Sequence, residues 1–130
     1  MRVFRALTAY ELGRPDAFDD LSAMLREPQA SHIPPWLWQV AGEVFLQGQR
    51  WAEAVIAFRR GGVDAARFDG VPWLNQYAVS LARSGASDAA RGALERAMLL
   101  APDEAILRHN LEVLRSGLDE ALTPHRIDPF

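Results

Sequence analysis

The chain has 130 residues, of which 49% are hydrophobic and 24% charged, a composition typical of a single globular domain. It contains no cysteine and no lysine, so thiolate metal ligands, thiol nucleophiles, a Walker-type phosphate-binding lysine and a Schiff-base lysine are all excluded. The formal net charge of −3, with no basic cluster larger than Arg59-Arg60, argues against a nucleic-acid partner, which would require a basic stripe.

Apolar residues recur with helical periodicity almost from end to end, and no segment alternates with the period of two that a half-buried strand needs. Glycines and prolines divide this pattern into pieces of helical length. The expected helices are 3–12, 16–26, 35–47, 51–60, 72–84, 88–100 and 103–122. Because the turns within each pair are short, the paired helices must be antiparallel neighbours. The sequence therefore predicts an all-α fold.

Two of the helical pairs carry the same pattern of small and large residues, with Trp38 aligned to Leu74, 36 positions later. The first copy consists of Trp38, Ala41, Gly42, Phe45, Ala54 and Phe58. The second copy consists of Leu74, Tyr77, Ala78, Leu81, Ala90, Leu94, Ala97 and Pro102. The small residues allow two helices to approach closely, while the large ones fill the space on either side. We therefore expect each copy to form one tightly packed helical hairpin.

This pattern resembles the tetratricopeptide repeat, a helix-turn-helix unit of 34 residues with the consensus W-x2-L-G-x2-Y, then A-x3-F, then P. The resemblance is strongest over residues 35 to 68 and 71 to 104, and residues 1 to 30 are interpreted as a degenerate, shortened hairpin. It implies a right-handed α-solenoid of antiparallel helix hairpins, with about three repeats and a capping helix over residues 105 to 122. Residues 1 to 122 would then form a single domain. Residues 123 to 130, which have two prolines and no periodicity, are expected to be a flexible tail.

One departure from the family pattern lies in the link between the two clear repeats. The stretch from Gly61 to Pro72 is two residues longer than the family period and contains three glycines, Gly61, Gly62 and Gly70. The stack of helices is expected to bend or open there. The alternative is that the extra residues form a surface turn, since lengthening a loop costs little free energy.

The sequence offers few groups for catalysis or metal binding. His109 and Glu112 are three residues apart on an expected helix and could share a face, but a zinc site needs three or four ligands and no HExxH motif accompanies them. The carboxylates Asp16, Asp19 and Asp20 open a helix, where acidic residues are stabilising in any case. No nucleophile elbow, dinucleotide-binding loop or phosphate-binding loop occurs. We therefore expect no enzyme, no cofactor and no bound metal.

The resemblance also implies where a partner would bind, because in this family the first helix of each hairpin lines a concave groove. The positions that would line it are Trp36, Gln39, Glu43, Leu46, Gln47, Asn75, Gln76, Val79, Arg83, Ile106, His109, Asn110 and Val113. Some family members grip a C-terminal carboxylate with Lys, Asn and Arg, but Gln39, Glu43 and Asn110 occupy the corresponding places here. An extended strand or short helix anchored by apolar side chains fits such a groove better than an acidic tail.

The predicted function is accordingly a non-catalytic protein-interaction module, such as an adaptor, a scaffold or a small dedicated chaperone. Trp36 is the expected hot spot, with packing against the N-terminal hairpin as the alternative. A homodimeric structural subunit is a second hypothesis, and a metal-dependent enzyme or regulator centred on His109 a third. No apolar run approaches the roughly 20 residues that span a bilayer, and Arg5 and Glu11 interrupt any secretory core. We expect a cytoplasmic protein without a membrane partner, and the absence of lysine is associated with GC-rich bacterial genomes.

Overall fold

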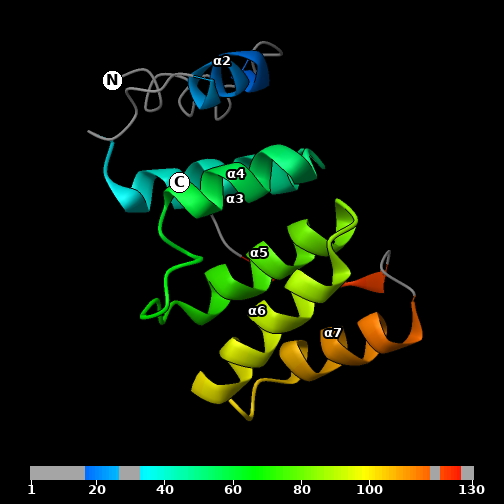
Figure 1. Ribbon diagram of the computed structural model, residues 1–130. Coiled ribbons are helices and arrows are strands. Elements are labelled where there is room, and N and C mark those ends of the chain that lie inside the picture. Colours follow the sequence, from blue (N-terminus) through cyan, green and yellow to red (C-terminus); the bar gives the residue numbers. More distant parts are fainter. Residues whose placement is uncertain (1–16, 27–32, 118–120, 127–130) are drawn as a thin grey trace. The chain divides into compact units, whose positions relative to one another are not determined.

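The computed structural model describes residues 17–26, 33–117 and 121–126 (Figure 1). Within these residues there are six helices and no strand, so the predicted all-α class is confirmed for the described part of the chain. The helices are α2 (Ala17–Leu25), α3 (Pro35–Gln47), α4 (Trp51–Arg60), α5 (Val71–Arg83), α6 (Ser87–Leu100) and α7 (Ala105–Ser116). The helix expected over residues 3–12 lies outside the described residues. None of the described helices has the length and hydrophobicity of a membrane span.

The chain divides into two compact units, and the division falls between Gly62 and Val63. It therefore lies in the glycine-rich link that the sequence singled out as too long for the family period. The first unit contains α2, α3 and α4, and the second contains α5, α6, α7 and residues 121–126.

The first unit is organised around the hairpin of α3 and α4, which pack against each other. Helix α3 starts after Pro34 with a proline in its first turn, a position where the missing N–H costs nothing. Trp38, Phe45 and Phe58 are completely buried between the two helices and their neighbours. A Cβ atom at Gly42 would lie 2.6 Å from two ring carbons of Phe58. The expected close approach at Gly42 is therefore confirmed, because only a glycine leaves room for this ring.

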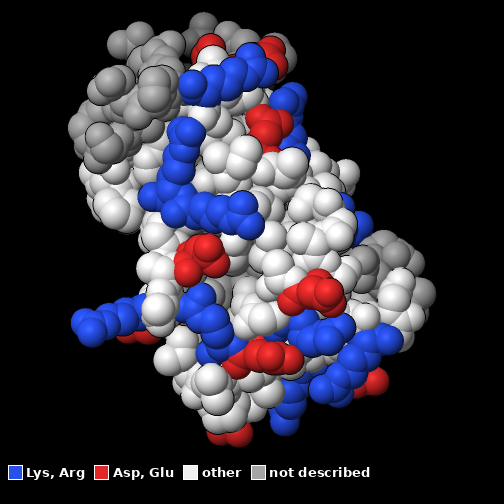
Figure 2. Space-filling model, in the orientation of Figure 1, with Lys and Arg blue, Asp and Glu red and all other residues white. Residues whose placement is uncertain are grey.

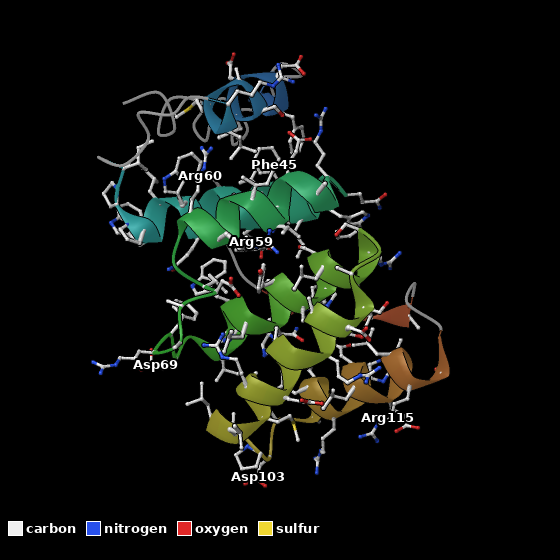
Figure 3. The ribbon with its side chains drawn as sticks, viewed as in Figure 1. Phe45, Arg59, Arg60, Asp69, Asp103 and Arg115 are labelled. Carbon is white, nitrogen blue, oxygen red and sulfur yellow. The ribbon has the colours of Figure 1, made fainter. Side chains whose placement is uncertain are left out.

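Helix α2 packs on the α3–α4 hairpin in the first unit. The ring of Phe18 lies 6.3 Å from that of Phe45, centroid to centroid. Arg60, at the end of α4, donates to the carbonyl oxygens of Met24 and Leu25 at the end of α2. Its guanidinium also lies 5.1 Å from the ring centroid of Trp38, a cation–π contact. Phe45 and Arg60 are labelled in Figure 3, where both side chains extend toward α2.

In the second unit, α5 and α6 form a hairpin that repeats the turn of the first. The amide of Ala86 donates to the carbonyl of Leu81 at 2.8 Å, as the amide of Arg50 does to that of Phe45, 36 positions earlier. The residue before each donor has a left-handed backbone, with φ of 95° at Gly85 and 59° at Gln49. Two hairpins with the same residue spacing therefore close with the same hydrogen bond and with a left-handed residue at the same place.

The α5–α6 hairpin also has the expected packing of small and large side chains. Ala78 and Ala90 are buried, and so are Leu74, Leu81 and Leu94. Small side chains on both helices allow the backbones to come close, and the leucines fill the remaining volume.

Helix α7 packs against α6 and is shorter than the sequence predicted. The predicted helix ran to Leu122, whereas α7 ends at Ser116. The reason is Gly117, which has φ of 76° and donates its amide back to the carbonyl of Leu114, a left-handed glycine stop. Leu122 is still buried, although it lies outside the helix. The prediction of one continuous helix from residue 103 to 122 was therefore wrong.

Candidate functional site

Three residues with carboxamide side chains are completely buried in the second unit. Asn75 and Gln76 lie on α5, and Asn110 lies on α7, and each residue is 0% exposed. Buried polar groups destabilise a protein unless they form hydrogen bonds, so three such amides must have partners. Their partners are backbone and side-chain groups of residues 121–126, named here the C-terminal segment. We call Asn75, Gln76 and Asn110 the amide clamp.

The side chain of Asn110 forms hydrogen bonds with both backbone groups of Thr123. The Thr123 amide donates to Asn110 Oδ1 at 2.8 Å, and Asn110 Nδ2 donates to the Thr123 carbonyl at 2.8 Å. A carboxamide that accepts from an N–H and donates to the C=O of the same residue imitates a neighbouring β-strand.

Gln76 makes the same pair of bonds two residues further along. The His125 amide donates to Gln76 Oε1 at 2.7 Å, and Gln76 Nε2 donates to the His125 carbonyl at 3.2 Å. Bonds to residues 123 and 125, with residue 124 between them, have the period of two that an extended chain presents to one side. The clamp therefore recognises an extended backbone.

Asn75 connects the two halves of the clamp. Its Oδ1 accepts from Asn110 Nδ2 at 2.7 Å. Its Nδ2 donates to the Thr123 carbonyl at 3.1 Å and lies 2.9 Å from Nδ1 of the His125 ring. Both hydrogens of each asparagine nitrogen thus have an acceptor, and the buried network is satisfied.

The directions of the bonds that join Asn110, Asn75 and the His125 ring follow from one backbone group, the Thr123 amide. The Thr123 amide can only donate, so the atom of Asn110 that faces it must be the oxygen. Asn110 Nδ2 then donates to Asn75 Oδ1, which leaves Asn75 Nδ2 as the donor to the His125 ring. His125 Nδ1 must therefore be an acceptor, and the ring is neutral with its proton on Nε2.

The electrostatic surroundings of His125 favour the same protonation state. Burial lowers the pKa of His125 from its ordinary value of 6.5, and the carboxylate of Glu104, which precedes α7, raises it by a smaller amount. Desolvation disfavours the charged imidazolium, and the Asn75 N–H that faces Nδ1 disfavours it further. A neutral His125 is thus part of the docked arrangement.

The remaining contacts of the C-terminal segment concern its first residues. Leu122 is 6% exposed and so is almost completely removed from water, while Thr123 and Pro124 are exposed. His109 Nε2 lies 3.2 Å from the carbonyl oxygen of Ala121. Because a carbonyl only accepts, His109 donates this bond from Nε2.

The structure brings together four of the residues predicted to line a groove, namely Asn75, Gln76, His109 and Asn110. All four bond to residues 121–125. Of the others in the second unit, Val79 and Val113 are buried, and Ile106 and Arg83 are partly exposed. What the sequence did not predict is the occupant, because residues 123–130 were expected to be a flexible tail, whereas Thr123 and His125 are bound by the clamp.

The predicted groove positions on α3 have different surroundings within the first unit. Gln39 Nε2 donates to the carbonyl of Gly61 at 2.8 Å, which ties the start of α3 to the end of α4. Glu43 is 2% exposed and accepts from Gln47 Nε2 at 3.0 Å. Leu46 is buried, and Trp36 is 59% exposed. Trp36 is therefore largely accessible to solvent.

The pair considered as metal ligands, His109 and Glu112, have other partners. His109 bonds to Ala121, and Glu112 forms an exposed ion pair with Arg115 at 3.6 Å. Among the described residues there is no group of three or more His, Asp or Glu side chains that could hold a metal ion. Figure 2 shows basic and acidic side chains interspersed on the visible face. Comparisons of the chain with protein-family models, with curated proteins and with solved structures found no match.

Proposed function

We propose that this protein is a non-catalytic interaction module that binds an extended segment of a partner protein between α5 and α7. The observation that carries the proposal is the amide clamp, in which Asn110 and Gln76 each bond to both backbone groups of a single residue. Such bonds depend on the shape of a backbone rather than on its side chains. They can therefore be made to a segment of another protein.

We also propose that the module is a tetratricopeptide-like solenoid of antiparallel helix hairpins. The supporting observations are the matching hydrogen bonds of the two hairpin turns and the close contact of Gly42 with Phe58. A further one is the position of Asn75 and Asn110, 35 residues apart on α5 and α7, which places equivalent amides side by side. A solenoid exposes the same helix face from each repeat, so it lines a groove with matching side chains.

The chemistry of the clamp suits a carrier or adaptor better than a catalyst. Carboxamides do not titrate in the physiological range, and each supplies both donors and an acceptor. Hydrogen bonds of this kind contribute little net free energy each, since water competes for the same groups. Binding would then be reversible and would depend on the conformation of the partner, as an adaptor or small chaperone requires.

Capture of partner proteins by one bait with an intact amide clamp and one with a disrupted clamp tests the proposal. The bait is the full chain with Leu122→Asp, which disfavours docking of the C-terminal segment by placing a charge at a buried position. The same bait with Asn110→Ala added should lose a captured protein, whereas the control Arg108→Ala, an exposed side chain two positions earlier on α7, should retain it. If no protein from the native host depends on Asn110, the proposed function is refuted.

A further inference from the structure

We propose that the groove selects extended segments with the pattern aliphatic, any residue except proline, proline, histidine, and that Leu122–Thr123–Pro124–His125 is an internal copy of this ligand. A partner segment with the same pattern would displace the internal copy. This inference rests on the proposed function and specifies the class of partner. It follows from the burial and the hydrogen bonds of each of the four residues.

The first position requires an aliphatic side chain. Leu122 is the one residue of the described C-terminal segment that is almost fully buried. Burial of a leucine-sized side chain is the apolar anchor that binding of a short peptide needs. A charged or small residue here would leave a charge desolvated or a space unfilled.

The second position tolerates any side chain but not the loss of an N–H. The Thr123 residue is exposed, and its backbone amide donates to Asn110 at 2.8 Å. Alanine would keep this bond, and proline would remove it. Comparing the alanine and proline substitutions therefore distinguishes the contribution of the backbone N–H from that of the side chain at this position.

The third position favours proline for two reasons. The clamp bonds to the residues on either side, and Pro124 itself is exposed and has no N–H to satisfy. A proline also holds the preceding residue in an extended conformation, which is the one that Asn110 recognises. Less conformational entropy is then lost when the segment binds.

The fourth position requires a side chain that accepts a hydrogen bond. Gln76 bonds to both backbone groups of His125, and Asn75 Nδ2 is directed at the unprotonated Nδ1 of its ring. Asn75 cannot turn its oxygen toward the ring without losing the bond from Asn110. A neutral imidazole fits this geometry, and an alanine would leave an N–H of Asn75 without its acceptor.

The internal copy is suited to exchange because most of its bonds use backbone groups that a partner would also have. Since it is part of the same chain, it competes at a high effective concentration, of the order of millimolar for a short connection. Free peptide should therefore bind weakly to the wild-type chain and more tightly once the internal copy is released.

The test uses the full chain with Leu122→Asp, and Thr123→Pro as a second released variant that leaves the apolar anchor in place. The probe is a fluorescent peptide with the sequence Ala-Leu-Thr-Pro-His-Arg, blocked at both ends. Binding is measured by anisotropy and by NMR signals of the Asn75, Gln76 and Asn110 side-chain amides. We expect the probe to bind both released variants at least about ten-fold more tightly than the wild-type chain.

Substitutions in the probe then test the pattern. Replacing the threonine with alanine should leave the affinity within about two-fold, and replacing it with proline should weaken binding about ten-fold or more. Replacing the leucine with aspartate or the histidine with alanine should also weaken binding. Equal affinities for all these peptides would overturn the inferred pattern while leaving the groove intact, provided that Asn110→Ala abolishes binding.

Other outcomes separate the inference from the proposed function. If neither released variant binds the probe, the internal copy is not a ligand and the inference fails, while partner capture still tests the proposed function. If adding Asn110→Ala to the Leu122→Asp chain leaves probe binding unchanged, both the inference and the proposed function fail. If the wild-type chain is a dimer by light scattering and Leu122→Asp makes it a monomer, the segment belongs in the groove of a second copy, which also overturns the inference.

Discussion

The substitution Asn110→Ala should release the C-terminal segment while leaving the helices of the second unit folded. It removes two hydrogen bonds to Thr123 and one to Asn75 Oδ1. The Thr123 groups can turn to water, so their net loss is small, but Asn75 is 0% exposed and its oxygen would have no partner. An unsatisfied buried acceptor costs about 1 to 3 kcal/mol, so we expect docking to weaken by about 2 kcal/mol.

Amide hydrogen exchange at Thr123 and His125 measures this local equilibrium directly. A loss of about 2 kcal/mol corresponds to exchange that is about 30-fold faster at both amides. Amides in the middle of α5 and α6 should change far less, which separates release of the segment from general unfolding. The control is Arg108→Ala, an exposed substitution on the same helix, which should leave exchange unchanged.

Asn110→Asp sharpens the same test because it preserves the shape of the side chain. The carboxylate still accepts from Thr123, but it cannot donate to Asn75 Oδ1, 2.7 Å away, or to the Thr123 carbonyl. Two acceptors then face an anion, so at neutral pH the Thr123 amide should be less protected from exchange than in Asn110→Ala. Its protection, measured against the intrinsic exchange rate at each pH, should rise as the carboxyl protonates. Exchange rates at Thr123 equal to wild type in both variants would refute the network.

Four further predictions concern pH and the scaffold. Since the docked pKa of His125 lies below its ordinary 6.5, the released segment binds a proton more readily; docking should be strongest above that pH and weaken as the pH falls below it toward the lowered pKa. NMR titration checks this, and protection of the Thr123 amide, measured against the intrinsic exchange rate at the same pH, that does not fall between about pH 7.5 and about pH 5.5 would contradict it. Gly42→Ala should cost about 1 to 3 kcal/mol in urea unfolding because its Cβ would lie 2.6 Å from Phe58, whereas Gly92→Ala, with nothing within 4 Å, should stabilise α6 by about 0.5 to 1 kcal/mol. Gln49→Gly should raise the melting temperature by relieving a left-handed backbone at φ of 59°, worth about 1 kcal/mol; a lower melting temperature would count against that strain. Trp38→Ala should cost about 3 to 5 kcal/mol, while Trp36→Ala, 59% exposed, should cost under about 1 kcal/mol, and equal losses would mean that the indole of Trp36 is structural.

Local signals were sufficient to predict most helices. Two predicted helices, 35–47 and 51–60, coincide with α3 and α4. Pro34 precedes the first of them, and the left-handed residues Gln49 and Gly62, with φ of 59° and 78°, lie two positions after the helix ends. The last helix was predicted too long because its apolar spacing continues past Gly117. There a left-handed glycine outweighed the periodicity of the leucines.

The candidate site was predictable in part. Asn75, Gln76, His109 and Asn110 could be assigned to one surface because the resemblance to a repeat family implies which face of each helix is presented together. Their shared partner could not be predicted, since Thr123 and His125 lie in a segment without periodicity. The bonds from Asn75 and Gln76 connect residues 48 to 50 positions apart in the chain.

Neighbours along the chain thus specify most of the helices, their turns and the small residues at their contacts. The enclosure of the C-terminal segment by side chains of α5 and α7 depends instead on how distant parts of the chain meet in the folded protein. A side-chain amide has no preferred partner until folding buries it, and the nearest backbone that can satisfy it is then selected by proximity in space.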